Sequence, residues 1–280
     1  MEALASPFFQ RALVGGLLAA LASGVVGTYV VVKEASAVSG GMAHAAFGGL
    51  GLGYLLGFSP MAGAAGFALL SGLVVGLAHR RLRQGLDTLV MMMWSVGMAV
   101  GILCVAAVPG YAPDLTSYLF GNLLFVTPRY LWIAAGLDAV VLAAVALFGR
   151  QLRAVAFDEE FSEIVGVPVD AVILLLLGLA SLVVVLLIRV VGVLLAVALL
   201  TIPAALARHW SATLGRMMVL ATAAGALFVA TGLFAAYGLS ASFGLDLPSG
   251  PLIVLAAGGG FAVSAWLSEL RSRTEGEATA

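Results

Sequence analysis

Residues 35–78 read ASAVSGGMAHAAFGGLGLGYLLGFSPMAGAAGFALLSGLVVGLA, a stretch that contains no Asp, Glu, Lys or Arg. A membrane span needs about 20 consecutive apolar residues, so this stretch can form two spans with a tight turn between them. His44 is its only histidine. Such a stretch is suited to lipid rather than to water, and it indicates that the chain is a membrane protein.

The rest of the chain has the same character. Of 280 residues, 62% are hydrophobic and 10% are charged, whereas a soluble domain has about 25% charged residues. We expect an all-α polytopic membrane protein with about nine transmembrane helices, forming a single transmembrane domain over residues 1–270. A short polar cytoplasmic tail follows over 271–280. The predicted apolar segments are 9–32, 37–58, 60–78, 88–108, 115–126, 130–149, 169–189, 191–207, 217–238 and 250–268.

Several classes of function are excluded by the composition. A net charge of −1 provides no basic surface for a nucleic acid. The single cysteine, Cys104, rules out a disulfide framework and a thiolate zinc cluster. The only lysine, Lys33, follows Val32 and lacks the Gly-x-x-x-x-Gly-Lys pattern of a phosphate-binding loop. We therefore expect a chain with no enzymatic activity and no cofactor of its own, which cannot hydrolyse ATP to drive its own work.

Clusters of positive charge predict the orientation, because cytoplasmic loops are enriched in Lys and Arg. The clusters are Lys33, Arg80–Arg83, Arg150 with Arg153, Arg208 with Arg216, and Arg271 with Arg273. All of these clusters fall on the same side of the membrane if segment 115–126 does not cross it. We therefore expect this segment to form a short re-entrant or half-buried helix near the outer face. The N-terminus then lies outside and the C-terminus in the cytoplasm. Arg129 and Arg189 fall on the outer side, at span ends where a long side chain can reach the interface.

Glycines four residues apart occur repeatedly, at 49/53, 53/57, 72/76 and 97/101. Small residues let helix backbones approach closely in lipid. The spacing favours tight packing within one bundle; a subunit interface or a moving seam is the alternative.

Ionisable groups inside spans are functional candidates by default. His44 lies in the second span and Asp138 lies near the middle of segment 130–149. A neutral imidazole is a common ligand of zinc and related metals, but His44 could also be a packing residue. Asp138 could equally form an interhelical hydrogen bond.

The longest polar connection is 150–168, RQLRAVAFDEEFSEIVGVP. We expect a short cytoplasmic amphipathic helix here, started by Asp158 and Glu159, with a further acid at Glu160, and ended by Gly166 and Pro168. Its apolar face would be formed by Phe157, Phe161, Ile164 and Val165. Such a helix could lie on the membrane or dock in a groove of another protein; its acidic face favours docking.

These features together resemble the permease subunit of metal-ion ABC importers, the zinc, manganese and iron group, over roughly residues 9–268. The resemblance is carried by these stretches: Gly27–Lys33 (GTYVVVK) before Met42–Ala45 (MAHA), Asp87–Leu89 (DTL), Ser117–Pro128 (SYLFGNLLFVTP), Val191–Arg208 (VGVLLAVALLTIPAALAR) and Pro248–Pro251 (PSGP).

The resemblance implies a homodimer in the cytoplasmic membrane of a bacterium or archaeon. Its partners would be two cytoplasmic ATPase subunits, which bind the ATP, and an extracytoplasmic protein that delivers a divalent metal ion as the transported substrate. It also implies that segment 150–168 contains the coupling helix and that His44 lines the metal path.

One departure from the family pattern concerns the metal path. The family often carries an Asp one helical turn before the histidine, and the matching position here is Gly40. Ser39, Asp138 and Glu34 are the side chains that could compensate, together with His44, as metal-contacting residues.

Three functions stay open from the residues. The first is import of zinc, manganese or iron, among which the sequence does not choose. The second is an importer permease of similar architecture for a metal chelate or a corrinoid. The third is a self-sufficient secondary transporter with Asp138 as its coupling acid; the coupling segment and the family stretches argue against it.

Overall fold

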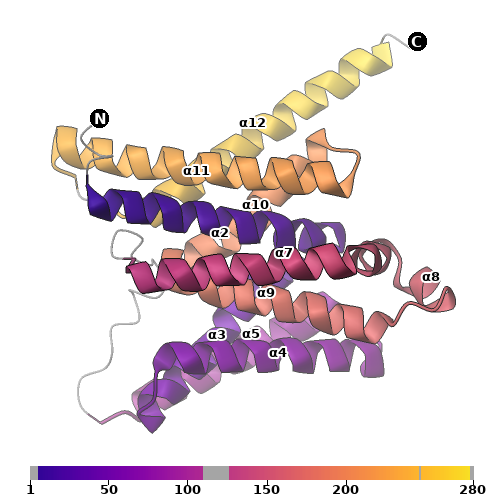
Figure 1. The fold of residues 1–280 in the computed structure, drawn as a ribbon, viewed down its shortest axis with the longest axis horizontal. Helices are drawn as coiled ribbons and strands as arrows, with labels where there is room; N and C mark the ends of the chain where they lie inside the picture. Colours follow the sequence, from indigo (N-terminus) through magenta and orange to yellow (C-terminus); the bar gives the residue numbers. More distant parts are fainter. Residues whose placement is uncertain (1–5, 110–125, 246, 278–280) are drawn as a thin grey trace.

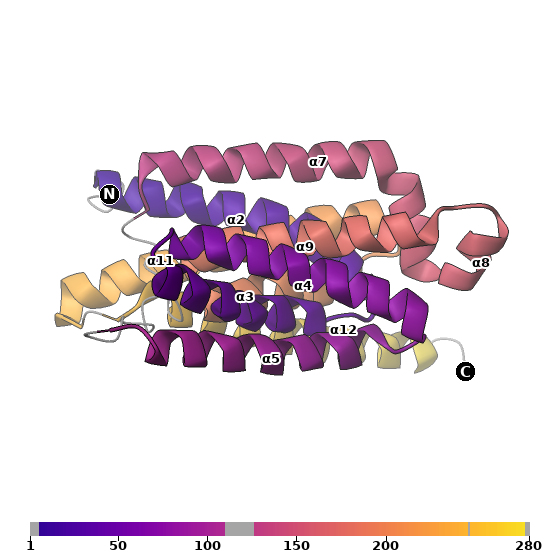
Figure 2. The ribbon, with the colours of Figure 1, turned by 90° about the horizontal axis from the view of Figure 1, so that it is seen from below.

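The computed structural model describes residues 6–109, 126–245 and 247–277, with side chains up to Arg271. These residues form helices and contain no strand. The helices are α2 (Pro7–Val32), α3 (Ala37–Leu56), α4 (Pro60–Leu82), α5 (Leu86–Ala106), α7 (Pro128–Phe157), α8 (Glu159–Ile164), α9 (Val169–Val191), α10 (Val193–Trp210), α11 (Leu214–Phe243) and α12 (Ser249–Glu277). Figures 1 and 2 show the long helices running side by side, with α8 beyond one end of the bundle.

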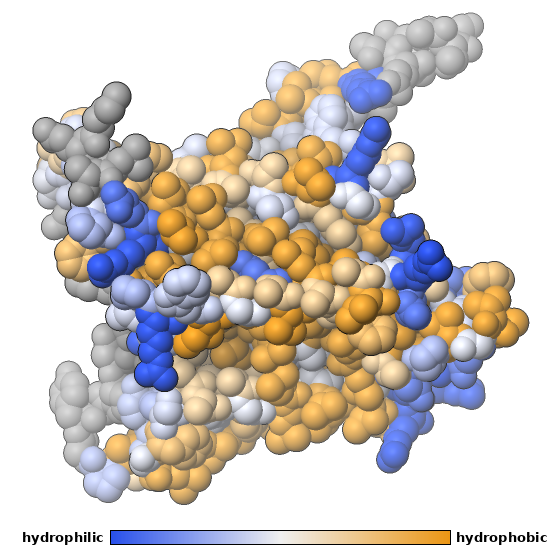
Figure 3. Space-filling view, in the orientation of Figure 1, coloured by the Kyte–Doolittle hydropathy of each residue, from blue (hydrophilic) through white to orange (hydrophobic). Residues whose placement is uncertain are grey.

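The lengths of the helices fit a membrane. Among the described residues, eight helices are long and apolar enough to cross one, and the glycine-rich α3 runs between two of them as a ninth long helix. Figure 3 shows hydrophobic side chains across the middle of the molecule and most hydrophilic ones toward its two ends. The prediction of an all-α membrane protein with about nine spans is confirmed. The predicted re-entrant helix at 115–126 falls, except for Val126, outside the described residues.

Local sequence signals explain where the helices begin and end. Pro7, Pro60 and Pro128 each open a helix, at the position where the missing N–H costs nothing. Gly192 separates α9 from α10 with φ 87° and ψ 165°, a conformation that is open essentially only to glycine. One residue therefore reverses the chain between two spans.

Several helices are longer than predicted. Helix α7 continues to Phe157, α11 covers Leu214–Phe243, and α12 continues to Glu277, although the apolar runs end earlier. The reason is that polar residues such as Gln151 and Arg153 leave the lipid but are good helix formers. The predicted tail at 271–280 accordingly begins as part of α12.

Helices α2, α3 and α9 are the most enclosed of the long helices and form the core. Helix α2 packs on α7, α9, α10 and α11, while α3 packs mainly on α4 and α5. Several of the paired glycines lie at these contacts: Gly53 faces Pro60 of α4, Gly72 faces Ser181 of α9, and Gly101 faces the backbone of Phe47 in α3. Their packing within one bundle matches the first interpretation of the spacing.

Candidate functional site

A cavity of about 690 Å³ opens among α3, α5, α10 and α12. Its lining consists of Ser36, Ala37, Ser39, Gly40, His44, Trp94, Val193, Leu194, Val197, Ala198, Thr201, Ile202 and Val254. Among the described residues that line the cavity, His44 has the only ionisable side chain. The structure therefore places the predicted metal-path histidine at a mainly apolar cavity.

The His44 ring is held by an aromatic neighbour. The indole of Trp94 on α5 stacks on the imidazole with ring centroids 4.2 Å apart and an angle of 4° between the planes. Nδ1 of His44 is buried and has no hydrogen-bond partner among the described residues. Because Nδ1 is enclosed, Nε2 is the ring nitrogen that remains for an ion in the cavity.

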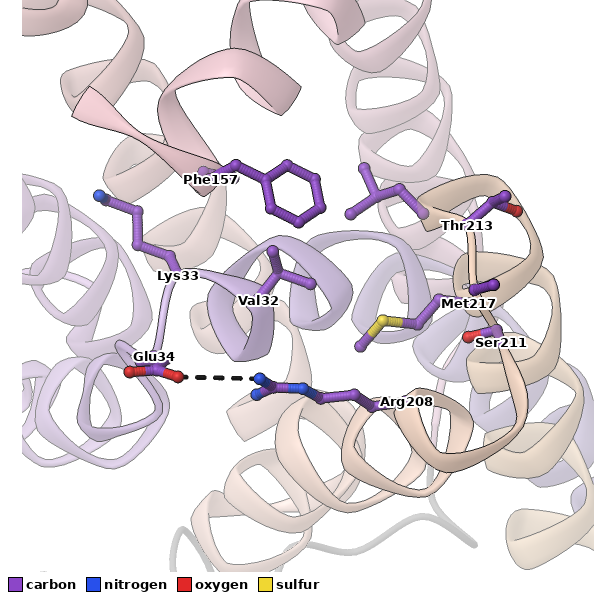
Figure 4. Close-up of a pocket in the computed structure, with 11 residues that line it drawn as sticks. Val32, Lys33, Glu34, Phe157, Arg208, Ser211, Thr213 and Met217 are labelled. Carbon is purple, nitrogen blue, oxygen red and sulfur yellow. Dashed lines mark ion pairs between the residues drawn. The ribbon is translucent and has the colours of Figure 1, made fainter. Parts of the chain in front are cut away.

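Two of the candidates that could replace the missing acid already interact with other groups of the chain. Ser39 lines the same cavity, but its Oγ donates to the carbonyl oxygen of Ser36 at 2.8 Å. Glu34 lies at the corner between α2 and α3 with φ 57°, and one of its oxygens lies 3.7 Å from Nη2 of Arg208. Figure 4 shows Glu34 pointing toward Arg208 in a second pocket, which does not include His44.

Asp138 is buried on α7, with 4% of its surface exposed. Neither carboxylate oxygen has a hydrogen-bond partner among the described residues. Helix α7 packs mainly on α2 and α9, and Asp138 does not line the cavity at His44. Within one chain, the structure does not bring these two candidates together.

No group of three or more His, Cys, Asp or Glu side chains that could hold a metal ion is found in the described part of the chain. The described residues offer His44 and neutral hydroxyl groups as ligands at the cavity. An imidazole alone gives weak ligation compared with an imidazole–carboxylate pair.

The predicted coupling segment forms a helix outside the bundle. Asp158 caps α8, because its Oδ1 accepts from the backbone N–H of Phe161 at 2.9 Å. Gly166, with φ 84°, turns the chain back after the helix. Phe157 is the last residue of α7 rather than a residue of α8, since the cap at Asp158 starts a new helix.

The apolar residues of this segment face solvent. Phe161, Ile164 and Val165 are 60%, 82% and 57% exposed, and Phe157 beside them is 68% exposed. A surface of this kind outside a membrane span indicates a contact with a partner or a membrane. We call these four residues the apolar face of the coupling segment.

The acidic residues of the segment attach it to the bundle. Glu159 forms an ion pair with Lys33 at the end of α2, and Nε2 of His79 on α4 lies 3.3 Å from its Oε2. Arg80 pairs with Glu163 at 2.8 Å and also with Asp170 at the start of α9. Glu160 is exposed. We call the contacts of Lys33 and His79 with Glu159 the Glu159 clasp.

Electrostatics favour an ionised Glu159. Its burial alone would raise the pKa of the carboxyl, but the hydrogen bond and charge of Lys33, together with His79, hold that pKa below its ordinary value. The clasp thus connects α8 to the corner between α2 and α3 through the opposite charges of Glu159 and Lys33.

Sequence reasoning missed Trp94 and the partners of Glu159. In the sequence, Lys33 stands out only as a positive charge at a span end and His79 only as the neighbour of the Arg80–Arg83 cluster. Helix α5 contains several large apolar residues with no pattern that singles out Trp94. These pairs form between residues about 50, 126 and 80 positions apart, so only the packing of the helices reveals them.

Comparisons with known proteins agree with this architecture. The model of the ABC 3 transport family matches residues 5–268. The chain is 38% identical to an uncharacterized membrane protein of Synechocystis, covering 94% of this chain and 92% of that protein. It is 30% identical to the manganese transport system membrane protein MntC of Halalkalibacterium halodurans, covering 95% and 89%. The structure of PsaBC from Streptococcus pneumoniae in complex with Fab superposes with a TM-score of 0.79 at 31% identity, covering 94% of this chain and 93% of that chain. The chain belongs to the ABC 3 transport family.

Proposed function

We propose that this chain is the membrane permease of an ATP-driven importer for a divalent metal ion, delivered by an extracytoplasmic binding protein. The observation that carries the proposal is the family match over nearly the whole chain, together with relatives named as manganese transport proteins, MntC and the import permease ScaB of Streptococcus gordonii. Manganese is therefore the first cargo to test, before zinc and iron.

The parts of the chain fit separate roles in this function. Two copies would enclose a path along the cavity that carries His44, and each His44 would ligate the passing ion weakly. Weak ligation suits transit, because an ion that binds tightly leaves slowly. Ser39 and Glu34 are further contacts that the ion could meet in other conformations, and Asp138 joins them only if its replacement lowers uptake.

ATP hydrolysis would take place on two separate cytoplasmic subunits. The apolar face of the coupling segment supports docking, since Phe161, Ile164 and Val165 offer an exposed amphipathic helix for a groove. Movement of α8 would then be transmitted to the spans and would alternate the openings of the path. In this arrangement the N-terminus lies outside and the C-terminus lies in the cytoplasm.

The decisive experiment is reconstitution of the permease in liposomes with the ATPase and the binding protein encoded by the same organism. We expect ATP-dependent uptake of Mn²⁺, with Zn²⁺ and Fe²⁺ measured in parallel. ATPase stimulation by a binding protein loaded with a metal chelate, and not by one loaded with the free ion, would favour chelate import instead. Uptake by the permease alone would indicate a secondary transporter.

A further inference from the structure

The stacked pair of His44 and Trp94 is a feature that the proposed function leaves unexplained. The two rings lie face to face, at 4.2 Å and 4°. Trp94 is also the nearest neighbour of the space beside Gly40, since its Cζ3 would lie 3.4 Å from a Cβ at that position. One indole therefore covers the part of α3 that carries both residues.

The position of Trp94 is fixed by the packing of α5 on α3. Gly41, three residues before His44, lies directly against the side chain of Val90. Gly97 has its Cα in contact with the backbone of Ala45, because an added Cβ would lie 2.5 Å from the Ala45 Cα. These two close approaches lie one turn before and one turn after Trp94, so the indole cannot slide along His44 without separating the helices.

A metal-binding histidine usually donates its second ring N–H to a carboxylate or a carbonyl group, which fixes the orientation of the ring. His44 lacks such a bond: its Nδ1 is buried without a partner among the described residues. We propose that Trp94 is the positioning residue of His44, and that stacking replaces the missing hydrogen bond in directing Nε2 at the ion. The proposal rests on the proposed function.

Stacking also supports the ligated form of the ring. When Nε2 donates its lone pair to a divalent cation, the imidazole becomes electron-poor. The electron-rich face of an indole attracts such a ring, as it attracts a cation. Trp94 therefore adds to the affinity for the ion without contacting it, on a chain that has Gly40 where the family often has an acid.

A matched pair of variants tests this role through transport. Trp94→Phe keeps an aromatic face, whereas Trp94→Leu fills the space with an apolar side chain that cannot stack. We expect Trp94→Leu to lower Mn²⁺ uptake by the reconstituted importer by about tenfold or more, the cost typical of losing an outer-shell partner. Trp94→Phe should recover most of the rate. Trp132→Leu, at a position that is 79% exposed on α7, is the control and should leave uptake unchanged.

A spectroscopic test separates positioning from simple packing. In a variant with Trp132, Trp210 and Trp266 changed to Phe, all emission comes from Trp94. Titration of this purified permease variant, without its partner proteins, with Mn²⁺ should change this emission saturably, and His44→Ala in the same background should abolish the change.

Distinct outcomes overturn distinct claims. If the unmodified importer takes up no metal ion, the proposed function fails and the role of Trp94 fails with it. If the unmodified importer transports but Trp94→Leu matches Trp94→Phe, or Mn²⁺ leaves the emission unchanged, the positioning role alone is wrong.

Discussion

At the scale of single residues, Gly40 is the position where this chain departs from the pattern of its family. The nearest heavy atom to an added Cβ at position 40 is Cζ3 of Trp94 at 3.4 Å, an ordinary contact, so a side chain fits. We expect Gly40→Asp to fold and to place a carboxylate one turn before His44. A carboxylate–imidazole pair should bind a divalent ion about tenfold more tightly or better, and uptake should slow because release slows.

Mn²⁺ binding to the purified permease and uptake by the complete importer measure the two effects. The matched control is Gly41→Asp, where the added side chain would collide with Val90 and should prevent folding. If Gly40→Asp folds but changes neither binding nor uptake, position 40 does not lie on the metal path.

Asp138 allows a second prediction at this scale. The buried carboxyl group has no hydrogen-bond partner within the part of the chain that the structure describes. Such burial costs roughly 1–3 kcal/mol, so the near-isosteric Asp138→Leu should raise the melting temperature by about 2–8 °C. Uptake should stay within about twofold, because Asp138 does not line the cavity at His44. Thermal unfolding in detergent measures the first effect. A loss of uptake in Asp138→Asn would instead identify Asp138 as a metal-contacting residue.

The residue scale also shows what a sequence can predict. That His44 lies inside a span follows from local apolarity. That Trp94 stacks on it depends on the register between α3 and α5, which glycine contacts such as Gly97 with Ala45 determine. Glycine spacing reveals that helices pack closely but not which partners they choose, so the stack could not be predicted.

At the scale of elements, the Glu159 clasp links α8 to the corner between α2 and α3. The side chains of Lys33 and Glu159 are only 10% and 21% exposed, so their charges are poorly screened. We expect Lys33→Glu to uncouple the importer: ATP hydrolysis continues while uptake falls. The charge-swapped double variant, Lys33→Glu with Glu159→Lys, should recover uptake and show a coupling energy of about 1–3 kcal/mol in thermal stability. No recovery in the double variant would contradict the clasp.

The pH dependence of the clasp follows from the lowered pKa of Glu159. A carboxyl whose pKa is lower in the folded state stabilises that state above its ordinary value of 4.5, and this stabilisation is lost as the pH falls through the lowered pKa. We expect α8 to detach reversibly in that acidic range, seen by a fluorescent label on Phe161→Cys in a Cys104→Ala background. In Glu159→Gln, the label should already be mobile at neutral pH. If this variant still shows the same change at acidic pH, groups other than Glu159 cause the detachment.

The ends of a helix could be predicted from the sequence where neighbouring residues cap it. Asp158 and Gly166 start and end α8, as the sequence indicated. The end of α7 at Phe157 could not be predicted in this way, because α7 continues past the apolar run through residues that favour a helix in water as well.

At the scale of the whole molecule, the distribution of charge predicts the orientation. All but three of the 13 Lys and Arg residues belong to the clusters at the end of the bundle that carries α8; the exceptions are Arg11, Arg129 and Arg189. Arg189 lies at the opposite end with its guanidinium 4.6 Å from the centroid of the Tyr130 ring, a contact that accommodates a cation at an interface.

This asymmetry makes the topology testable with single cysteines in a Cys104→Ala background. Ser59→Cys lies in the turn between α3 and α4, and Ser211→Cys lies in the turn between α10 and α11, at the α8 end. With the cationic end in the cytoplasm, a membrane-impermeant maleimide should label Ser59→Cys on intact cells but Ser211→Cys only after the membrane is opened. The reverse pattern would invert the chain and place α8 outside, where it could not meet an ATPase. Labelling of both sites from one side would show that the number of crossings between residues 59 and 211 is even, and segment 115–126 would then have to cross the membrane.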